Sequence, residues 1–233
     1  MKKSLLVISV ITITLVLMAC QPSQTSGKVK LKTYADSLSY ALGYIYGSDI
    51  ADVDFDFNLN ILFKAIINAK DKNLEILTDA QISNLFERFH DMMTEKNYLE
   101  SEQIRMKNKA EGMAYMTTNA EDPDVVSHKS GIQYKVLKKG AGRMVRDGDT
   151  VTARYIGKFI DGTIFDSSEQ RGEPMTFDIS MVIKGWNEGL KLMRVGDTFE
   201  IVIPDSLAYG DMGYEIIEPG SYLIFEVELV SIK

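Results

Sequence analysis

Between residues 147 and 229 the chain concentrates aromatic and branched apolar side chains in short, separated segments. These are Tyr155 with Gly157, the runs Asp161 to Ser167, Val182 to Trp186 and Leu207 to Gly210, and the stretch Leu223 to Leu229. No segment supplies a nucleophile, a base and metal ligands at the spacing that covalent or metal catalysis requires. These residue types favour a pocket that works by shape and by removing water, without making a bond.

The elements that position these residues are predicted to be β-strands, because apolar residues alternate with polar ones from Gly131 onward. The predicted inward positions are Ile132, Tyr134 and Val136; Val151, Ala153, Tyr155, Gly157 and Phe159; Phe199, Ile201 and Ile203; Leu223, Phe225, Val227 and Leu229. Asp161-Gly162 predicts a tight hairpin. One short helix, from Trp186 to about Met193, places Trp186, Leu190 and Met193 on one face. The sequence therefore predicts an α+β fold, with an antiparallel sheet curled over one helix.

Residues 31–120 show a helical period instead. Apolar residues recur every three or four positions between Lys32 and Ile50, and again after Asn58. A third helix is predicted from Asp79 to about Asn119. Asp36 and Ser37 are the expected caps of the first helix, and Thr78 to Gln81 has the form of a capping box for the third.

The third helix changes character along its length. Its first half carries an apolar stripe, made of Ile82, Leu85, Phe86, Phe89, Met92 and Met93. The segment from Glu95 to Glu111 is mostly charged, which is typical of a solvated stalk that joins two domains. Two short helices cannot easily cover so much apolar surface, so we expect a homodimer through residues 31–95.

The N-terminus has the pattern of a secretory signal, with Lys2 and Lys3 followed by an apolar run from Leu5 to Met18. The sequence from Leu17 to Cys20 resembles a bacterial lipobox, which implies cleavage before Cys20 and lipidation of that thiol. An ordinary signal peptide, or a membrane anchor with an incidental cysteine, is the alternative. We therefore expect the chain to have four segments: a signal peptide at 1–19, a tether at 20–30, a helical domain with its stalk at 31–120, and a C-terminal domain at 121–233.

Composition excludes several other classes. The net charge is -7 and the sequence pI is about 5.0, which argues against a nucleic-acid partner because phosphate binding needs clustered Lys and Arg. His90 and His128 lie in different elements without ligand partners at metal spacing. Gly140 to Gly142 does not open a helix, so it is no dinucleotide loop. We predict neither a metal nor a cofactor.

These segments together resemble the FKBP-type peptidyl-prolyl cis-trans isomerases, over about residues 131–233. The segment Asp36 to Gly43 is similar to the helical dimerisation domain of the Mip-type (macrophage infectivity potentiator) members. The resemblance implies a curved antiparallel FKBP sheet behind an all-helical N-terminal domain and a long connecting helix. It also implies prolyl cis-trans isomerisation without a cofactor.

The resemblance also implies which residues form the site. The expected catalytic residues are Tyr155, Asp166, Trp186, Tyr209 and Phe225, and the expected substrate-binding residues are Phe165, Met175, Val182, Ile183 and Ile217. The indole of Trp186 would form the pocket floor. The hydroxyl of Tyr209 would face the peptide, and the backbone N–H of Ile217 would meet a substrate carbonyl.

The residue types alone leave other roles open. Trp186 and Tyr155 could be simple core residues, and Phe225 could be both core and pocket wall. Asp166 could cap a turn or pair with Arg154, and Tyr209 could serve a turn together with the following glycine.

Two departures from the family pattern lie at the predicted rim of the pocket. Met175 stands where the family often has an aromatic residue, and a thioether gives a less rigid contact. Glu218-Pro219 stands where two prolines are common, and the preceding loop from Asp211 to Glu215 is about one residue short. We expect altered peptide preference and weaker binding of the macrolide inhibitors typical of the family.

The resulting hypothesis is a lipoprotein isomerase of the bacterial cell envelope, facing the periplasm, that assists the folding of exported X-Pro-containing polypeptides. The competing hypothesis is a non-catalytic chaperone or scaffold that uses the same pocket, or the cleft between protomers. A surface adhesin is a third possibility, which only the anchor supports.

Overall fold

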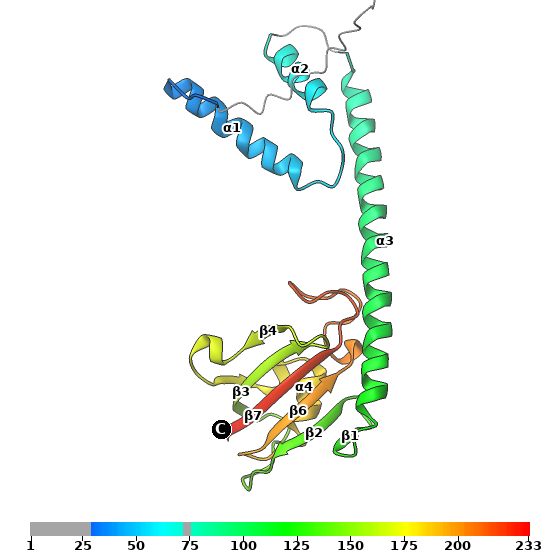
Figure 1. Cartoon of the computed structure of the whole chain (residues 1–233), viewed down its shortest axis with the longest axis vertical. Helices are drawn as coiled ribbons and strands as arrows, with labels where there is room; N and C mark the ends of the chain where they lie inside the picture. The colour runs from blue at the N-terminus through cyan, green and yellow to red at the C-terminus, as the bar shows by residue number, and fades with distance from the viewer. Residues whose placement is uncertain (1–28, 72–75) are drawn as a thin grey trace, which may run out of the picture. The chain divides into compact units, whose positions relative to one another are not determined.

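The computed structural model describes residues 29–71 and 76–233 (Figure 1). The expected signal segment, Cys20 and all but the last residues of the expected tether lie outside the described residues. The described chain divides into two units, one ending at Ile76 and the other spanning Leu77–Lys233.

Three helices precede the sheet: α1 (Tyr34–Ala51), α2 (Leu59–Lys70) and α3 (Asp79–Asn119). The predicted capping box of α3 is confirmed, because Thr78 and Gln81 bond each other's backbone N–H groups. The predicted caps of α1 were wrong by three residues or more. Thr33 is the N-cap, and Asp36 completes the box as its N3 residue. The Thr33 hydroxyl and Asp36 carboxylate together satisfy N–H groups that the first turn leaves unpaired.

No residue of α1 or α2 is buried within the protomer. Their apolar side chains remain about half exposed, including Leu38, Leu42, Ile45, Leu59, Phe63, Ile66 and Ile67. Isolated helices of this length are marginal in water unless an apolar face is covered. Among the described helices, none is both long enough and apolar enough to span a bilayer.

The second unit contains a seven-stranded antiparallel sheet with the order β1-β2-β6-β7-β3-β4, in which β5 also pairs with β3. Its strands are β1 (Val125–Ser127), β2 (Gln133–Lys138), β3 (Thr150–Phe159), β4 (Ile164–Ser167), β5 (Met175–Asp178), β6 (Thr198–Ile203) and β7 (Leu223–Ile232). The predicted α+β class is confirmed. The predicted hairpin at Asp161-Gly162 is confirmed, since it joins β3 to β4. The sequence did not predict β1 or β5, because strands of three or four residues are too short to show an alternating pattern.

The inner face of the sheet packs on the one short α-helix, α4 (Lys184–Leu190). Gly185 and Gly189 allow this close approach, since an added Cβ would lie 2.2 Å from Ile203 and 2.6 Å from Ile201. The predicted helix bounds were wrong, because α4 begins two residues before Trp186 and ends three before Met193.

The predicted inward residues of this segment are correct. Trp186, Leu190 and Met193 are buried in one apolar core with the alternating strand residues.

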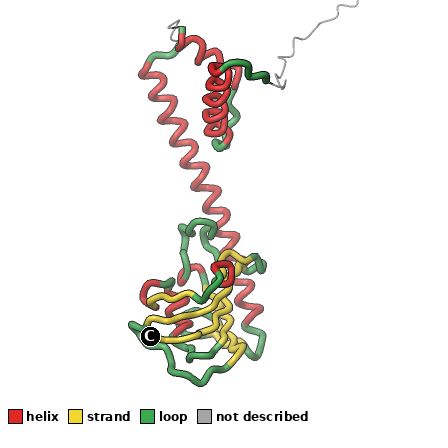
Figure 2. Tube along the Cα trace, turned by 90° about the vertical axis from the view of Figure 1, so that its left-hand side faces the viewer, coloured by secondary structure: helices red, strands yellow, loops and turns green. Residues whose placement is uncertain are grey.

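The outer face of the sheet is covered in part by α3. Gln133, Val202 and Ile224 face outward in one row across β2, β6 and β7, yet all three are buried. Gln133 donates to the backbone oxygen of Met116 in α3 at 2.9 Å, and the C-terminal half of α3 runs beside the strands in both views (Figures 1 and 2).

The predicted solvated stalk is therefore wrong for the later part of α3. From Arg105 onward several polar residues of the helix, Arg105, Asn108 and Lys109 among them, bind the sheet domain. Gly112 is buried against the ring of Tyr222. Charge along a helix does not distinguish solvent from a polar partner surface.

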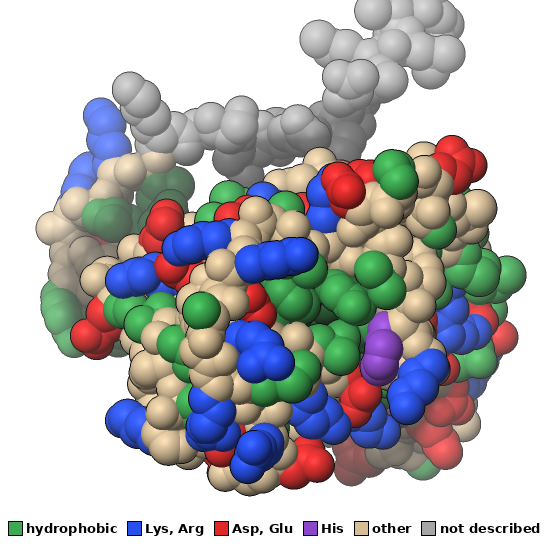
Figure 3. Space-filling model, turned by 90° about the horizontal axis from the view of Figure 1, so that it is seen from below, with side chains coloured by type: hydrophobic (Ala, Val, Ile, Leu, Met, Phe, Trp, Pro, Cys, Tyr) green, Lys and Arg blue, Asp and Glu red, His purple; other side chains and the backbone are tan. Residues whose placement is uncertain are grey.

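The face of the molecule seen from below has hydrophobic side chains near its middle, with both basic and acidic side chains around them (Figure 3).

Candidate functional site

The site is built around the indole of Trp186, in the first turn of α4. Three rings surround it: Tyr155 of β3 at 5.1 Å between centroids, and Phe177 of β5 and Phe225 of β7 at 5.2 Å each. All three contacts are edge-to-face, the arrangement that aromatic quadrupoles favour. Trp186, Tyr155 and Phe225 are each no more than 9% exposed, so they form a rigid apolar floor.

The structure brings the other expected residues around this floor. Phe165 meets Phe225 edge-to-face at 5.6 Å. The partly buried side chains packed against the same core include Phe165, Met175, Val182, Ile183 and Tyr209, and Ile217 is buried with it. A buried floor with a partly buried apolar rim is an arrangement that can hold a small apolar group out of water.

One edge of the floor is polar. The hydroxyl of Tyr155 donates to Oδ2 of Asp166 at 2.6 Å, and Arg171 donates to Oδ1 of the same carboxylate at 2.9 Å. The alternative pairing of Asp166 with Arg154 is wrong, since Arg154 binds Glu228 on the outer face. Both oxygens of Asp166 are thus engaged.

The Tyr155 hydroxyl stays protonated over a wide pH range. Burial, and then the hydrogen bond to Asp166, raise the pKa of Tyr155 from 10.0 to about 12. A phenol that is neutral when folded but ionises near pH 10 when unfolded adds stability below pH 10. That stability is lost as the pH rises to about 12.

Tyr155→Phe should therefore destabilise the protein most at neutral pH, because it removes the hydrogen bond, and progressively less between about pH 10 and 12. Urea denaturation of both proteins across this range measures the difference in unfolding free energy. A difference that stays constant with pH would contradict the assignment of the raised pKa.

The indole N–H of Trp186 is buried without a hydrogen-bond acceptor among the described residues. Leaving a buried donor unpaired typically costs about 1–3 kcal/mol. The pocket floor is therefore not arranged for stability alone, a common property of functional sites.

The loop between β6 and β7 carries Tyr209 and Ile217. Tyr209 stacks on Tyr214 at 5.3 Å, and the Tyr209 pKa is raised by burial and by nearby groups that include Asp166. The backbone N–H of Ile217 donates to the oxygen of Tyr214 at 2.8 Å, and Tyr214 N–H returns a bond of equal length. The N–H expected to meet a substrate carbonyl is therefore already engaged.

Three contributors were not anticipated from the sequence: Phe177, Arg171 and Tyr214. Phe177 could have been identified, because it alternates with Met175 on β5 and so shares its face. Arg171 and Tyr214 come from irregular loops, for which residue spacing carries no such signal.

The described residues contain no group of three His, Cys, Asp or Glu side chains placed to hold a metal ion. A cavity of about 340 Å³ beside the rim is lined by Val182 and Leu207 together with polar side chains of α4. The chemistry that the site offers is apolar contact, a held phenol and a paired carboxylate.

Known proteins and protein families match this chain over most of its length. The sequence model of the FKBP-type peptidyl-prolyl cis-trans isomerases matches residues 141–230, and the model of the domain amino terminal to such isomerases matches residues 35–136. The outer membrane protein MIP of Legionella longbeachae is 38% identical over 204 residues, which cover 87% of this chain and 88% of that protein. The peptidyl-prolyl cis-trans isomerase Mip of Coxiella burnetii is 35% identical over 87% of this chain and 89% of its own.

The crystal structure of FkpA from Escherichia coli superposes with a TM-score of 0.71 at 32% identity, covering 88% of this chain and 99% of that one. Sequence and fold thus agree over both the helical and the sheet regions. The chain belongs to the FKBP family and is a peptidyl-prolyl cis-trans isomerase.

Proposed function

We propose that the Trp186 floor is the place where the chain binds and twists an X-Pro peptide bond. The observation that carries this proposal is the meeting of Tyr155, Phe177 and Phe225 around one buried indole, with Asp166 at the edge. A prolyl ring is compact and apolar, so it matches such a floor. The substrate class is X-Pro segments of unfolded polypeptides.

The barrier to be lowered is amide resonance, about 18–20 kcal/mol. In the planar ground state the carbonyl oxygen carries partial negative charge, which water stabilises. At the twisted transition state the resonance is lost and that charge falls. Removing water from the carbonyl therefore disfavours the planar forms more than the twisted one, which is differential binding of the transition state.

Polar groups at the edge would hold the twisted peptide. We assign the Tyr209 hydroxyl as the hydrogen-bond donor to the twisted peptide, because the Ile217 N–H is already bonded to Tyr214. Asp166 keeps Tyr155 in place and contributes a fixed negative charge. Because its two oxygens accept from Tyr155 and Arg171, we assign Asp166 no proton transfer.

We also propose that the protein works in the bacterial envelope as a lipid-anchored homodimer. The signal-like N-terminus with Cys20 supports the anchor, and the name of the Legionella relative, an outer membrane protein, agrees with that location. The uncovered apolar faces of α1 and α2 support a second copy as their partner. The clients would be exported proteins, held by two pockets at once.

The test is a protease-coupled assay on a panel of X-Pro tetrapeptides, using the chain without residues 1–27. Asp166→Ala should lower kcat/KM by about tenfold or more, because a charge-assisted hydrogen bond contributes about 1.5–3 kcal/mol and each 1.4 kcal/mol is a factor of ten. Glu173→Ala is the matched control, since Glu173 is an exposed carboxylate seven residues further along the chain. Equal activity of the two variants would overturn the role of Asp166.

One observation favours chaperone binding as a second activity. Met181, Met212 and Ile216 are 83%, 88% and 66% exposed. Met181 and Ile216 directly precede the site residues Val182 and Ile217, and Met212 lies three residues after Tyr209. Flexible apolar side chains adapt to many partners. Suppression of aggregation that is retained in the Asp166→Ala variant would support this activity as separate from catalysis.

A further inference from the structure

Backbone hydrogen bonds close the base of the loop that carries Tyr209 and Ile217, and we call this base, from Asp205 to Gly210 and at Gly220, the neck. Gly220 N–H donates to the oxygen of Gly210 at 2.9 Å, and Gly210 N–H donates to the oxygen of Asp205 at 2.9 Å. The stretch between Asp211 and Pro219 projects beyond this neck. The position of the neck therefore sets where Tyr209 and Ile217 stand relative to the floor.

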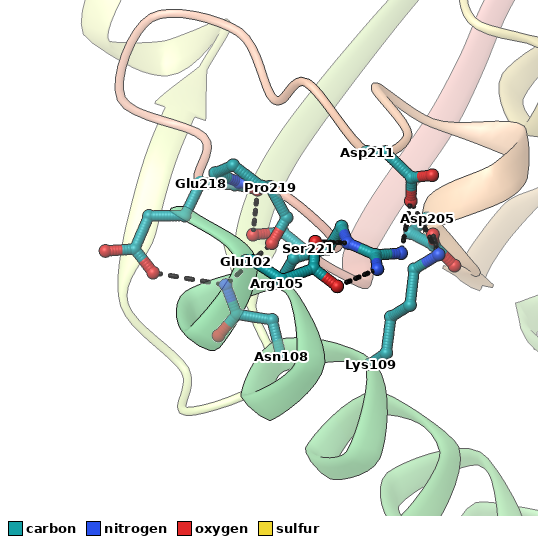
Figure 4. Close-up of polar contacts among 9 residues, drawn as sticks. All are labelled: Glu102, Arg105, Asn108, Lys109, Asp205, Asp211, Glu218, Pro219 and Ser221. Carbon is teal, nitrogen blue, oxygen red and sulfur yellow. Dashed lines mark hydrogen bonds and ion pairs between the residues drawn. The ribbon is translucent and has the colours of Figure 1, made fainter. Parts of the chain in front are cut away.

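Charged residues of α3 form ion pairs with one side of the neck (Figure 4). Lys109 Nζ lies 2.6 Å from Asp211 Oδ1 and 3.1 Å from Asp205 Oδ2, and Arg105 lies 3.3 Å from Asp211. Glu102 holds the guanidinium of Arg105 from the same helix, with Nε 2.8 Å from Oε2. The neighbouring cations, Lys109 first, lower the pKa of Asp211, so its carboxylate is charged at neutral pH.

A side-chain amide of α3 forms hydrogen bonds with the other side of the neck. Asn108 Nδ2 donates to the backbone oxygen of Pro219 at 3.0 Å and to Glu218 Oε2 at 3.1 Å. Gly220 then passes directly over the helix. An added Cβ there would lie 2.7 Å from the oxygen of Arg105, and its φ of +73° also favours glycine. The helix and the neck are thus fitted to each other.

We infer that Arg105, Asn108 and Lys109 are positioning residues for the isomerase site, and that α3 sets the substrate-binding geometry of the loop between β6 and β7. The inference rests on the proposed function of that site. None of the three residues needs to touch the peptide. They act through Asp205, Asp211 and Pro219 on Tyr209 and Ile217, the two residues of this loop that belong to the proposed site.

This assignment gives the polar half of α3 a role beyond spacing. The same continuous helix carries the apolar stripe that we assign to the dimer. Because α3 also docks at the neck, it can couple the association state of its N-terminal half to the affinity of the site for a substrate.

The test compares Asn108→Ala and Arg105→Ala with the control Lys107→Ala, on X-Pro tetrapeptides with the same chain without residues 1–27. Lys107 lies on the same turns, is 71% exposed and pairs only with Glu111 at 4.0 Å among the described residues. Both neck variants should raise KM about fivefold while kcat changes less, because they misplace binding groups and leave the floor intact. The control should match the wild type.

Two further readouts separate positioning from simple destabilisation. Salt should raise the wild-type KM, because it screens the exposed pairing of Arg105 with Asp211, and this dependence should be weaker in Arg105→Ala. Asn108→Asp should be worse than Asn108→Ala, because it places a carboxylate against Glu218, and adding Glu218→Gln should restore most of the loss. Fluorescence of Trp186, the only tryptophan, checks that the floor is unchanged.

The outcomes distinguish the two proposals. A wild-type chain without activity on any peptide would overturn the proposed function. An active wild type, with neck variants whose KM equals that of Lys107→Ala, would overturn only the positioning role. Lower stability with an unchanged KM, or no restoration by the double substitution, would also overturn it.

Discussion

Replacing Trp186 by alanine is expected to abolish isomerase activity and to lower the free energy of unfolding by about 3–5 kcal/mol, as for other buried aromatic truncations. The indole contacts three rings directly. Its loss leaves Tyr155, Phe177 and Phe225 without a common partner, so the rings rearrange and water enters. Without a dry floor the planar peptide is no longer disfavoured relative to the twisted one.

The matched control is Leu190→Ala, one turn further along α4. Leu190 is fully buried, so its truncation should cost a similar 2–5 kcal/mol, while the rings stay in place. Urea denaturation gives both stabilities, and turnover is compared at a temperature where both variants are folded. Equal loss of turnover in the two variants would mean that activity follows general stability and not this floor.

Introducing a charge at Phe86 is expected to convert a dimer into a monomer and to unfold the N-terminal helices. Phe86 lies in the apolar stripe of α3 and is 67% exposed in the protomer. An aspartate there would have to be buried in the proposed dimer, which is costly for an unpaired charge. The 18 residues of α1 and 12 of α2 would then lose the partner that covers them.

Sedimentation at micromolar concentration and far-UV circular dichroism measure these two effects for Phe86→Asp. Gln103→Asp is the control, because it adds the same charge to an exposed position of α3 beyond the stripe. The control should remain a dimer with full helix content. A wild-type chain that sediments as a monomer with the same helix content would contradict the assembly.

The regular elements could be predicted because their patterns are long. The 41 residues of α3 carry a capping box and have no proline, so both ends were visible. The long strands β3 and β7 span ten residues each and alternate over most of that length, which fixes the face that packs on the core. The residues of the floor followed from the same faces and from the family resemblance.

Contacts between residues that only the folded structure brings together could not be predicted. Arg171 reaches Asp166 across a short 3-10 turn, and nothing in the spacing selects it over Arg154. The bonding of the Ile217 N–H to Tyr214 depends on a loop in which Glu215 takes a φ of +50°, a conformation that the residue type disfavours. The docking of α3 rests on charges that equally suit water.

The most direct test of the central claim is NMR exchange spectroscopy of an X-Pro peptide with catalytic amounts of the wild-type chain, in H₂O and in D₂O. The account predicts faster cis-trans exchange in both directions, with rates nearly equal in the two solvents because no proton moves at the transition state. Exchange slowed severalfold in D₂O, or no acceleration in either solvent, would contradict it.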